Sequence, residues 1–73
     1  MGKRKLSMTN RVKELRAEAG GMTQQQLADL VGVTRQTVNV IEANKYSPSL
    51  EVAFLIAQSL QVQLEDVFGF IED

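Results

Sequence analysis

The sequence predicts an all-α domain made of five short helices. Apolar residues recur along most of the chain at spacings of three and four, which places them on one face of a helix. Threonine, serine or asparagine, the residues that favour helix starts, stand before four of these segments. Glycine, asparagine and proline separate several of them. We therefore expect a compact helical domain with brief connections.

The first two helices are bounded by start and stop residues. The first is predicted to begin near Asn10 and to end at Gly20 and Gly21. The second is opened by Thr23, and Gln26 three residues later completes a capping box. The inward faces of these two helices are expected to hold Val12, Leu15, Ala19, Leu27, Ala28 and Val31.

The third helix is predicted over residues 35–43. Thr34 caps its start, and Asn44 can end it because asparagine tolerates a left-handed backbone. Pro48 keeps the loop that follows from being helical. The helix is expected to turn Val38 and Ile41 inward.

A fourth helix and a short fifth one complete the predicted domain. Ser49 caps the fourth, and the fifth turn spans about residues 64–68 before Gly69 breaks it. The core stripe of the fourth helix consists of Leu50, Ala53, Ile56, Ala57 and Leu60.

The chain of 73 residues is long enough for one domain. We assign that domain to residues 10–68, with a basic arm or short strand at 1–9 and a tail at 69–73 that is open to forming a strand. A chain this short buries only about 60% of its unfolded surface, so its stability is marginal alone. A second copy is therefore an expected partner.

Charge is distributed unevenly, although the net charge is only −1. All eight basic residues lie within the first 45 positions, and every charged residue after Lys45 is acidic. Such a dipolar molecule can present a positive face to nucleic-acid phosphates. A chance distribution of solvated charges explains the pattern equally well, so charge alone does not decide.

The composition excludes several functions. The chain has no cysteine and no histidine, which removes disulfides, the commonest transition-metal ligands and any Ser-His or Cys-His nucleophile pair. We expect no enzyme activity, no cofactor and no metal. The apolar stretch 50–60 is too short to span a membrane, and the start lacks the features of a secretory signal. A cytoplasmic protein is the expectation.

Residues 23–42 have the pattern of two helices joined by a tight turn. Ala28 is small where two helices must cross closely, and Gly32 can adopt the positive φ that the turn needs. Val33 and Val38 fill the angle between the helices. This arrangement leaves the third helix protruding from the domain.

The outward side chains of the third helix suit the edges of DNA bases. Arg35 can pair with guanine, Gln36 and Asn39 can pair with adenine, and Val40 can contact a thymine methyl group. Each of these residues taken alone is better explained as an ordinary solvent-facing side chain. Their arrangement on a protruding helix favours a major-groove reader.

The segment 23–42, together with residues 44–50, resembles the Cro/C1-type (XRE) helix-turn-helix repressors, and above all their short dimeric members. The likeness extends over roughly residues 10–68. It implies a compact five-helix, lambda-repressor-like fold that binds double-stranded DNA. Two departures are visible: Asn44 stands where the family commonly has glycine, and Gly21 is an extra residue relative to many members.

The resemblance also implies roles for individual residues. Arg35, Gln36, Asn39 and Val40 are our candidates for base contacts, the last from its residue type alone. The candidates for phosphate contacts, which position the protein without reading sequence, are Thr23, Gln24, Thr34, Thr37, Asn44, Lys45, Tyr46 and Ser47. Arg16 and Glu42 match a pair that forms an ion pair between the first and third helices of the family.

Apolar residues near the C-terminus exceed what so small a core can absorb. We expect dimerisation through the fourth and fifth helices. The candidate dimer interface consists of Val52, Leu55, Val67, Phe68, Phe70 and Ile71. A second arrangement stays open, in which Phe70 and Ile71 fold back on their own domain and form a two-stranded ribbon with Leu6 and Met8.

Taken together, these features predict a homodimeric repressor or autoregulator that binds a pseudo-palindromic operator. Its recognition helices would enter successive major grooves about 34–36 Å apart. The alternative is an antitoxin-like or anti-regulator module that grips another protein through the C-terminal apolar patch. An enzyme is the remote third choice, because Glu65 and Asp66 stand at a helix start, where capping explains them.

Overall fold

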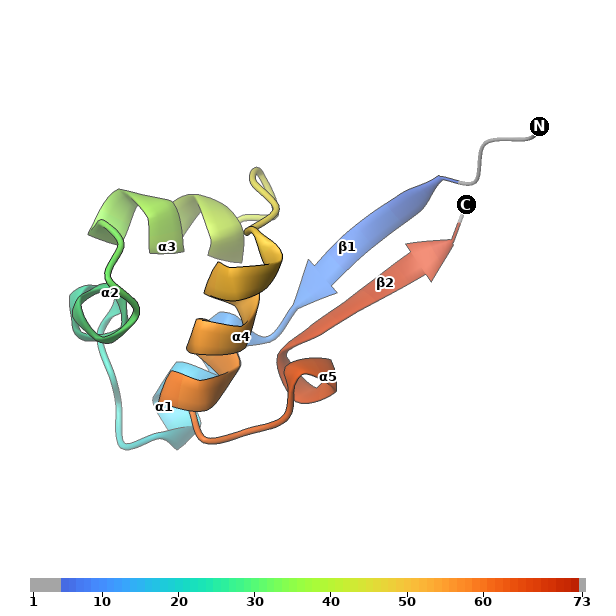
Figure 1. The fold of residues 1–73 in the computed structure, drawn as a ribbon. Coiled ribbons are helices and arrows are strands. Elements are labelled where there is room, and N and C mark those ends of the chain that lie inside the picture. The colour runs from blue at the N-terminus through green and yellow to red at the C-terminus, as the bar shows by residue number, and fades with distance from the viewer. Residues whose placement is uncertain (1–4, 73) are drawn as a thin grey trace.

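The computed structural model describes residues 5–72, which form five helices and a two-stranded sheet (Figure 1). The helices are α1 (Val12–Glu18), α2 (Gln24–Val31), α3 (Arg35–Glu42), α4 (Leu50–Ser59) and α5 (Leu64–Val67). The strands are β1 (Leu6–Asn10), which precedes α1, and β2 (Phe68–Glu72), which follows α5. The five predicted helices are therefore present, but the prediction of an all-α domain is corrected to a mostly helical domain with a small sheet.

The two strands pair antiparallel, from Leu6 opposite Glu72 to Asn10 opposite Phe68. They run side by side away from the helices, so that the two ends of the described chain lie close together (Figure 1). The two-stranded ribbon considered as an alternative thus forms, but it does not fold Phe70 and Ile71 back onto the domain, since they are 59% and 60% exposed. The predicted basic arm includes Lys3 and Arg4, which lie outside the described residues.

Strand pairing also moves two predicted helix boundaries. Asn10 was expected to cap α1, but it is the last residue of β1, and Arg11 occupies the N-cap position. The Asn10 side chain still accepts a hydrogen bond from the backbone N–H of Val12 (3.1 Å). At the other end, α5 stops before Phe68, and Gly69 continues the strand instead of breaking the chain. Pairing between distant segments overrides the local signals here.

The predicted caps and turns between the helices are confirmed. Thr23 and Gln26 form a capping box at the start of α2, and the side chains of Thr34 and Ser49 accept hydrogen bonds at the starts of α3 and α4. Gly32 has a φ of 87°, and Asn44 has a φ of 58°. Short-range chemistry therefore determines where α2, α3 and α4 begin.

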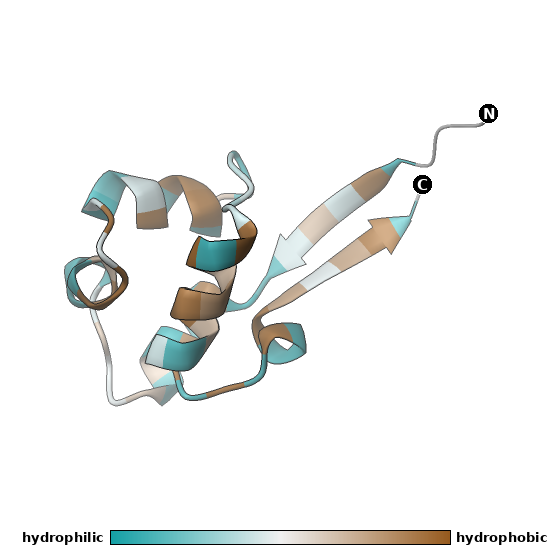
Figure 2. Cartoon of the chain, in the orientation of Figure 1, coloured by the Kyte–Doolittle hydropathy of each residue, from teal (hydrophilic) through white to brown (hydrophobic). Residues whose placement is uncertain are grey.

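The core lies where the five helices meet. Its buried apolar residues are Val12, Leu15, Leu27, Ala28, Val31, Val38, Ile41, Ala53, Ile56, Ala57, Leu60 and Val67. Two residues predicted to face inward are exposed: Ala19 at the end of α1, and Leu50 at the first position of α4, which is 69% exposed. Figure 2 shows apolar residues on α4 and along both strands.

An ion pair inside the fold joins Arg16 of α1 to Glu42 of α3, as the resemblance implied. The Nε atom of Arg16 lies 2.7 Å from one carboxylate oxygen, and Nη2 donates to the other at 3.1 Å. The Nη1 atom donates to the carbonyl of Met22 (2.7 Å). The two side chains are only 13% and 8% exposed. Because both charges are largely removed from water, the bidentate geometry and the third hydrogen bond are what make their burial tolerable.

Replacing Gly32 with alanine tests the left-handed turn between α2 and α3. A Cβ at this position would meet nothing within 4 Å, so only the positive φ opposes the side chain. We expect Gly32→Ala to lower the free energy of unfolding by about 1 kcal/mol, measured by urea denaturation. Gly32→Asn should lose less, because asparagine adopts this conformation more readily. An alanine variant as stable as the wild type would contradict the assignment.

Removing one partner of the Arg16–Glu42 pair tests its role in holding α1 to α3. Glu42→Ala leaves the guanidinium buried without a countercharge, and we expect the free energy of unfolding to fall by about 3 kcal/mol. The double variant Arg16→Leu, Glu42→Leu removes both charges and should be more stable than Glu42→Ala. If the double variant is the less stable of the two in the same urea titration, an unpaired charge is not the cause.

Candidate nucleic-acid interface

The helices α2 and α3 form a compact pair separated by the turn at Gly32. Figure 1 views α2 end-on while α3 lies across the page, so the two helices cross at a steep angle. Val38 and Ile41 turn one face of α3 into the core, where they are 1% and 2% exposed. The opposite face of α3 is thereby directed away from the domain, in the arrangement of a helix that can enter a DNA groove.

The outward face of α3 carries the candidate base-contacting residues. Arg35, Gln36 and Asn39 are exposed, whereas Val40 is half-buried. Three of the four candidates are thus freely accessible to a groove edge. Their assignment as base contacts stays a prediction.

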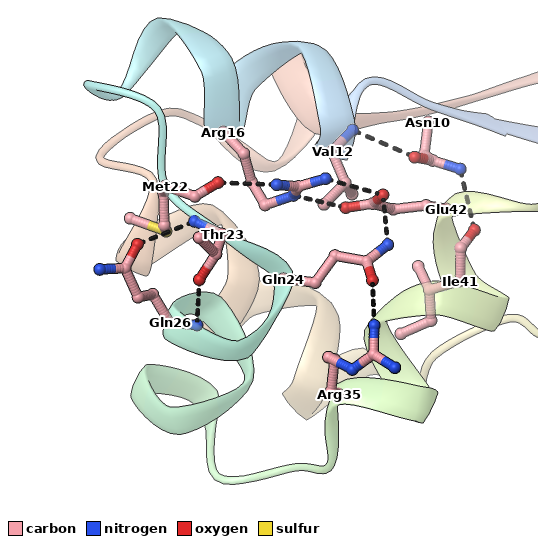
Figure 3. A network of polar contacts seen from close by, with 10 residues as sticks. All are labelled: Asn10, Val12, Arg16, Met22, Thr23, Gln24, Gln26, Arg35, Ile41 and Glu42. Carbon is pink, nitrogen blue, oxygen red and sulfur yellow. Dashed lines mark hydrogen bonds and ion pairs between the residues drawn. The ribbon is translucent and has the colours of Figure 1, made fainter.

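A chain of polar contacts connects the ion pair to this face (Figure 3). The amide nitrogen of Gln24, at the first position of α2, donates to Glu42 (3.0 Å). The amide oxygen of Gln24 accepts a long hydrogen bond from Arg35 (3.5 Å). Gln24 therefore bridges the buried carboxylate and the first residue of α3, and the second N–H of its amide is the group that could donate to a phosphate.

Three threonines predicted to contact phosphate also shape the helix starts. The hydroxyl oxygen of Thr23 accepts from the backbone N–H of Gln26 (3.0 Å), and that of Thr34 accepts from the backbone N–H of Thr37 (3.2 Å). The hydroxyls of Thr34 and Thr37 lie 3.0 Å apart. Helix capping is enough to explain why the first two threonines stand at these positions, without any contact with DNA. Their contact with phosphate stays a prediction.

The loop after α3 begins with a tight turn and exposes the remaining candidates. The N–H of Asn44 donates to the carbonyl of Ile41 (3.0 Å), and the N–H of Lys45 donates to that of Val40 (2.9 Å). This is a Schellman motif with asparagine in the left-handed position. The exposed candidates in this loop are Asn44, Lys45, Tyr46 and Ser47. Candidate phosphate contacts thus stand at both ends of α3.

Sequence reasoning recognised Asn10 only as a helix cap. Its amide nitrogen donates both to the carbonyl of Ile41 (3.0 Å) and to the side-chain oxygen of Asn44 (2.8 Å). These partners lie 31 and 34 residues further along the chain. No local pattern could have indicated them, since only the folded chain brings these segments together.

Two of the arginines are occupied by carboxylates of the same chain. Arg16 pairs with Glu42, and Arg11 contacts Glu14 (2.9 Å) and Glu18 (3.9 Å) at the protein surface. The hydrogen bond and charge of Arg11 lower the pKa of the Glu14 carboxyl. Arg35, in contrast, contacts the neutral amide of Gln24, so its positive charge stays available at α3.

The residues predicted to form a dimer interface divide into three groups. Val67 is 1% exposed and belongs to the core, which corrects its assignment to an interface. Val52, Leu55 and Phe68 are half-buried and pack against that core. Phe70 and Ile71, at 59% and 60% exposed, are the two that stand free on the ribbon.

Further exposed apolar residues lie on the same ribbon. Leu6, Met8 and Phe70 lie on one side of the ribbon, because Met8 pairs directly with Phe70 and Leu6 is two positions away. A groove of about 420 Å³ lies beside them. Its lining includes Met8, Pro48, Leu50, Ala53, Leu64 and Phe70. We call these exposed and groove-lining residues the ribbon surface.

None of the helices in residues 5–72 is both long and apolar enough to cross a membrane. Within the same residues, no group of three or more Asp, Glu, His or Cys side chains is placed to hold a metal ion.

Comparison with known proteins agrees with this geometry. A family model described as helix-turn-helix matches residues 12–67. YgzD of Bacillus subtilis, described as an uncharacterized HTH-type transcriptional regulator, is 48% identical over 66 residues, covering 90% of this chain and 98% of that protein. A protein of Archaeoglobus fulgidus with the same description is 46% identical over 66 residues, covering 90% of this chain and 92% of that protein.

A solved structure shows the same fold. The crystal structure of a candidate DNA-binding protein from Bacteroides fragilis matches with a TM-score of 0.76 and 31% sequence identity, covering 85% of this chain and 98% of that chain. The family match, the two relatives and the exposed third helix all agree with the resemblance seen in the sequence. The chain belongs to the Cro/C1-type helix-turn-helix family of transcriptional regulators.

Proposed function

We propose that this regulator binds specific DNA sequences by placing α3 in the major groove. The observation that carries the proposal is the outward polar face of α3, which has candidate phosphate-binding groups at both ends. Contacts to phosphate at the two ends would set the register of the helix, and side chains between them would read base edges. Such a regulator acts where prokaryotic DNA lies, in the cytoplasm.

The proposed division of labour follows the position of each side chain. The proposed base contacts are Arg35, Gln36, Asn39 and Val40. The proposed phosphate contacts are Thr23, Gln24, Thr34, Thr37, Asn44, Lys45, Tyr46 and Ser47. Arg35 is supported most strongly among the base contacts, because it lies at the exposed start of α3 beside the neutral amide of Gln24, which leaves its positive charge available.

We further propose that the regulator acts as a homodimer on a pseudo-palindromic operator, as a repressor or autoregulator that occludes a promoter. The ribbon surface supports self-association: two strands alone are marginally stable, and Leu6, Met8 and Phe70 leave apolar area in water. A two-fold axis would place the same surface of each copy against the other. Two recognition helices would then face successive grooves about 34–36 Å apart.

The same ribbon surface also supports a second candidate function. A different protein could occupy the groove beside Met8 and Phe70, which would make the chain an antitoxin-like or anti-regulator module. Self-association and capture of another protein compete for one surface, so the oligomeric state separates the two candidates.

Substitutions on α3 should separate base contacts from phosphate contacts. Binding sites selected from random duplexes should give a two-fold symmetric consensus for the wild type. Gln36→Ala should relax the preference at one base pair by about 1–3 kcal/mol, whereas Thr37→Ala should weaken binding to all sequences alike. An unchanged preference at every position in the Gln36→Ala variant would show that Gln36 does not contact a base.

In a sedimentation experiment, the wild type should behave as a species with the mass of two chains. Phe70→Ser should raise the dissociation constant of this dimer. Burial of a phenylalanine contributes about 1.5–3 kcal/mol, and the contact occurs twice in a symmetric dimer, so we expect at least about a tenfold rise. Leu30→Ser is the matched control, since Leu30 is 60% exposed but lies on α2, away from the ribbon surface. A wild-type monomer would contradict the homodimer and favour the second candidate function.

A further inference from the structure

We propose that Asn10 is a positioning residue that sets the loop at residues 44–47 for phosphate binding. The inference rests on the proposed function and adds to it a residue that does not itself contact DNA. Asn10 ends β1, and its amide nitrogen reaches the end of α3 through hydrogen bonds to Ile41 (3.0 Å) and Asn44 (2.8 Å). Figure 3 shows the first of these contacts beside the ion-pair network.

The hydrogen bonds of Asn10 fall on the groups that close the turn after α3. The carbonyl of Ile41 accepts from Asn10 and also from the backbone N–H of Asn44. Asn44 has a φ of 58°, a backbone conformation that disfavours side chains other than a few such as asparagine. Asn10 therefore holds both the side chain of the left-handed residue and the carbonyl that fixes its backbone.

The contact with Asn44 also orients that side chain. An asparagine amide has one oxygen that accepts and one NH₂ group that donates. Because Asn10 donates to the oxygen, the NH₂ group of Asn44 is the part left to donate to a phosphate oxygen, which only accepts. Without Asn10, the amide could turn and present its oxygen, which would repel a phosphate.

Packing does not replace this contact. A cavity of about 400 Å³ lies between β1 and the loop, and its lining includes Met8, Thr9, Asn44, Tyr46 and Pro48. Where side chains leave such a space, they make fewer van der Waals contacts between the loop and the strand. The hydrogen bonds of Asn10 therefore contribute directly to the attachment of the loop to β1.

The oxygen and the nitrogen of the Asn10 amide make different contacts, so the positioning role can be tested separately from the support of α1. The oxygen of Asn10 accepts from the backbone N–H of Val12 (3.1 Å), which supports the start of α1. The nitrogen makes the two bonds to the end of α3. Asn10→Ser keeps an oxygen that can accept from Val12 but lacks the reach to Ile41 and Asn44. It therefore removes the positioning contact while preserving the hydrogen bond from Val12.

The experiment compares wild type, Asn10→Ser, Asn44→Gly and the double variant on the operator selected for the wild type. Asn10→Ser should bind about 3- to 10-fold more weakly, as expected for lost hydrogen bonds, with the same base preference. Its affinity should also fall less steeply with added salt, because a displaced loop brings the cation of Lys45 less close to a phosphate. In the Asn44→Gly background, which keeps the positive φ but removes the amide, the further loss from Asn10→Ser should be smaller.

A measurement without DNA completes the test. Hydrogen exchange at the backbone amides of Asn44 and Lys45 should be faster in Asn10→Ser, while the urea midpoint changes little. Wild-type affinity and an unchanged salt dependence in Asn10→Ser would overturn this inference alone. A wild-type chain that shows no sequence preference in DNA binding would overturn the proposed function, and the positioning role with it.

Discussion

The buried ion pair between Arg16 and Glu42 is the constraint on which the helical arrangement depends. It joins α1 to α3. Arg16 also donates a hydrogen bond to the carbonyl of Met22, just before α2, and Gln24 connects Glu42 to the start of α3. A charge held out of water tolerates few alternative geometries, because a shifted helix would leave it unpaired. The same contact therefore links three helices, and together with the burial of Val38 and Ile41 it favours the orientation that turns the polar face of α3 outward.

The core is too small to bury all the apolar residues of the chain. The helices bury aliphatic side chains such as Leu27, Ile41 and Ile56, yet Phe54, Phe70 and Ile71 stay exposed. A domain of this size cannot enclose all its apolar residues, so part of them must meet solvent or a partner. The ribbon carries some of these residues away from the helices, and its base at Asn10 is also joined to the end of α3. The surfaces proposed for self-association and for DNA binding thus lie in neighbouring parts of one structure.

The site was predictable to the extent that it depends on local chemistry. The outward placement of Arg35, Gln36 and Asn39 followed from the helical period, and the ion pair followed from a resemblance that supplied the register. Val40 is less accessible than the period alone suggested. The link from Asn10 to Asn44 was not predictable, because the two residues are 34 positions apart and neither belongs to a recognisable pairing pattern.

The sequence by itself determined the caps at Thr23, Thr34 and Ser49 and the left-handed turns at Gly32 and Asn44. These features depend on contacts within a few residues, so residue types at fixed spacing are enough to locate them. Only the tertiary structure decided that the two chain ends pair as strands, that Val67 is enclosed and that Leu50 is exposed. An apolar residue carries the same local signal whether it meets its own core, a partner or solvent, and only the folded chain determines which of these it contacts.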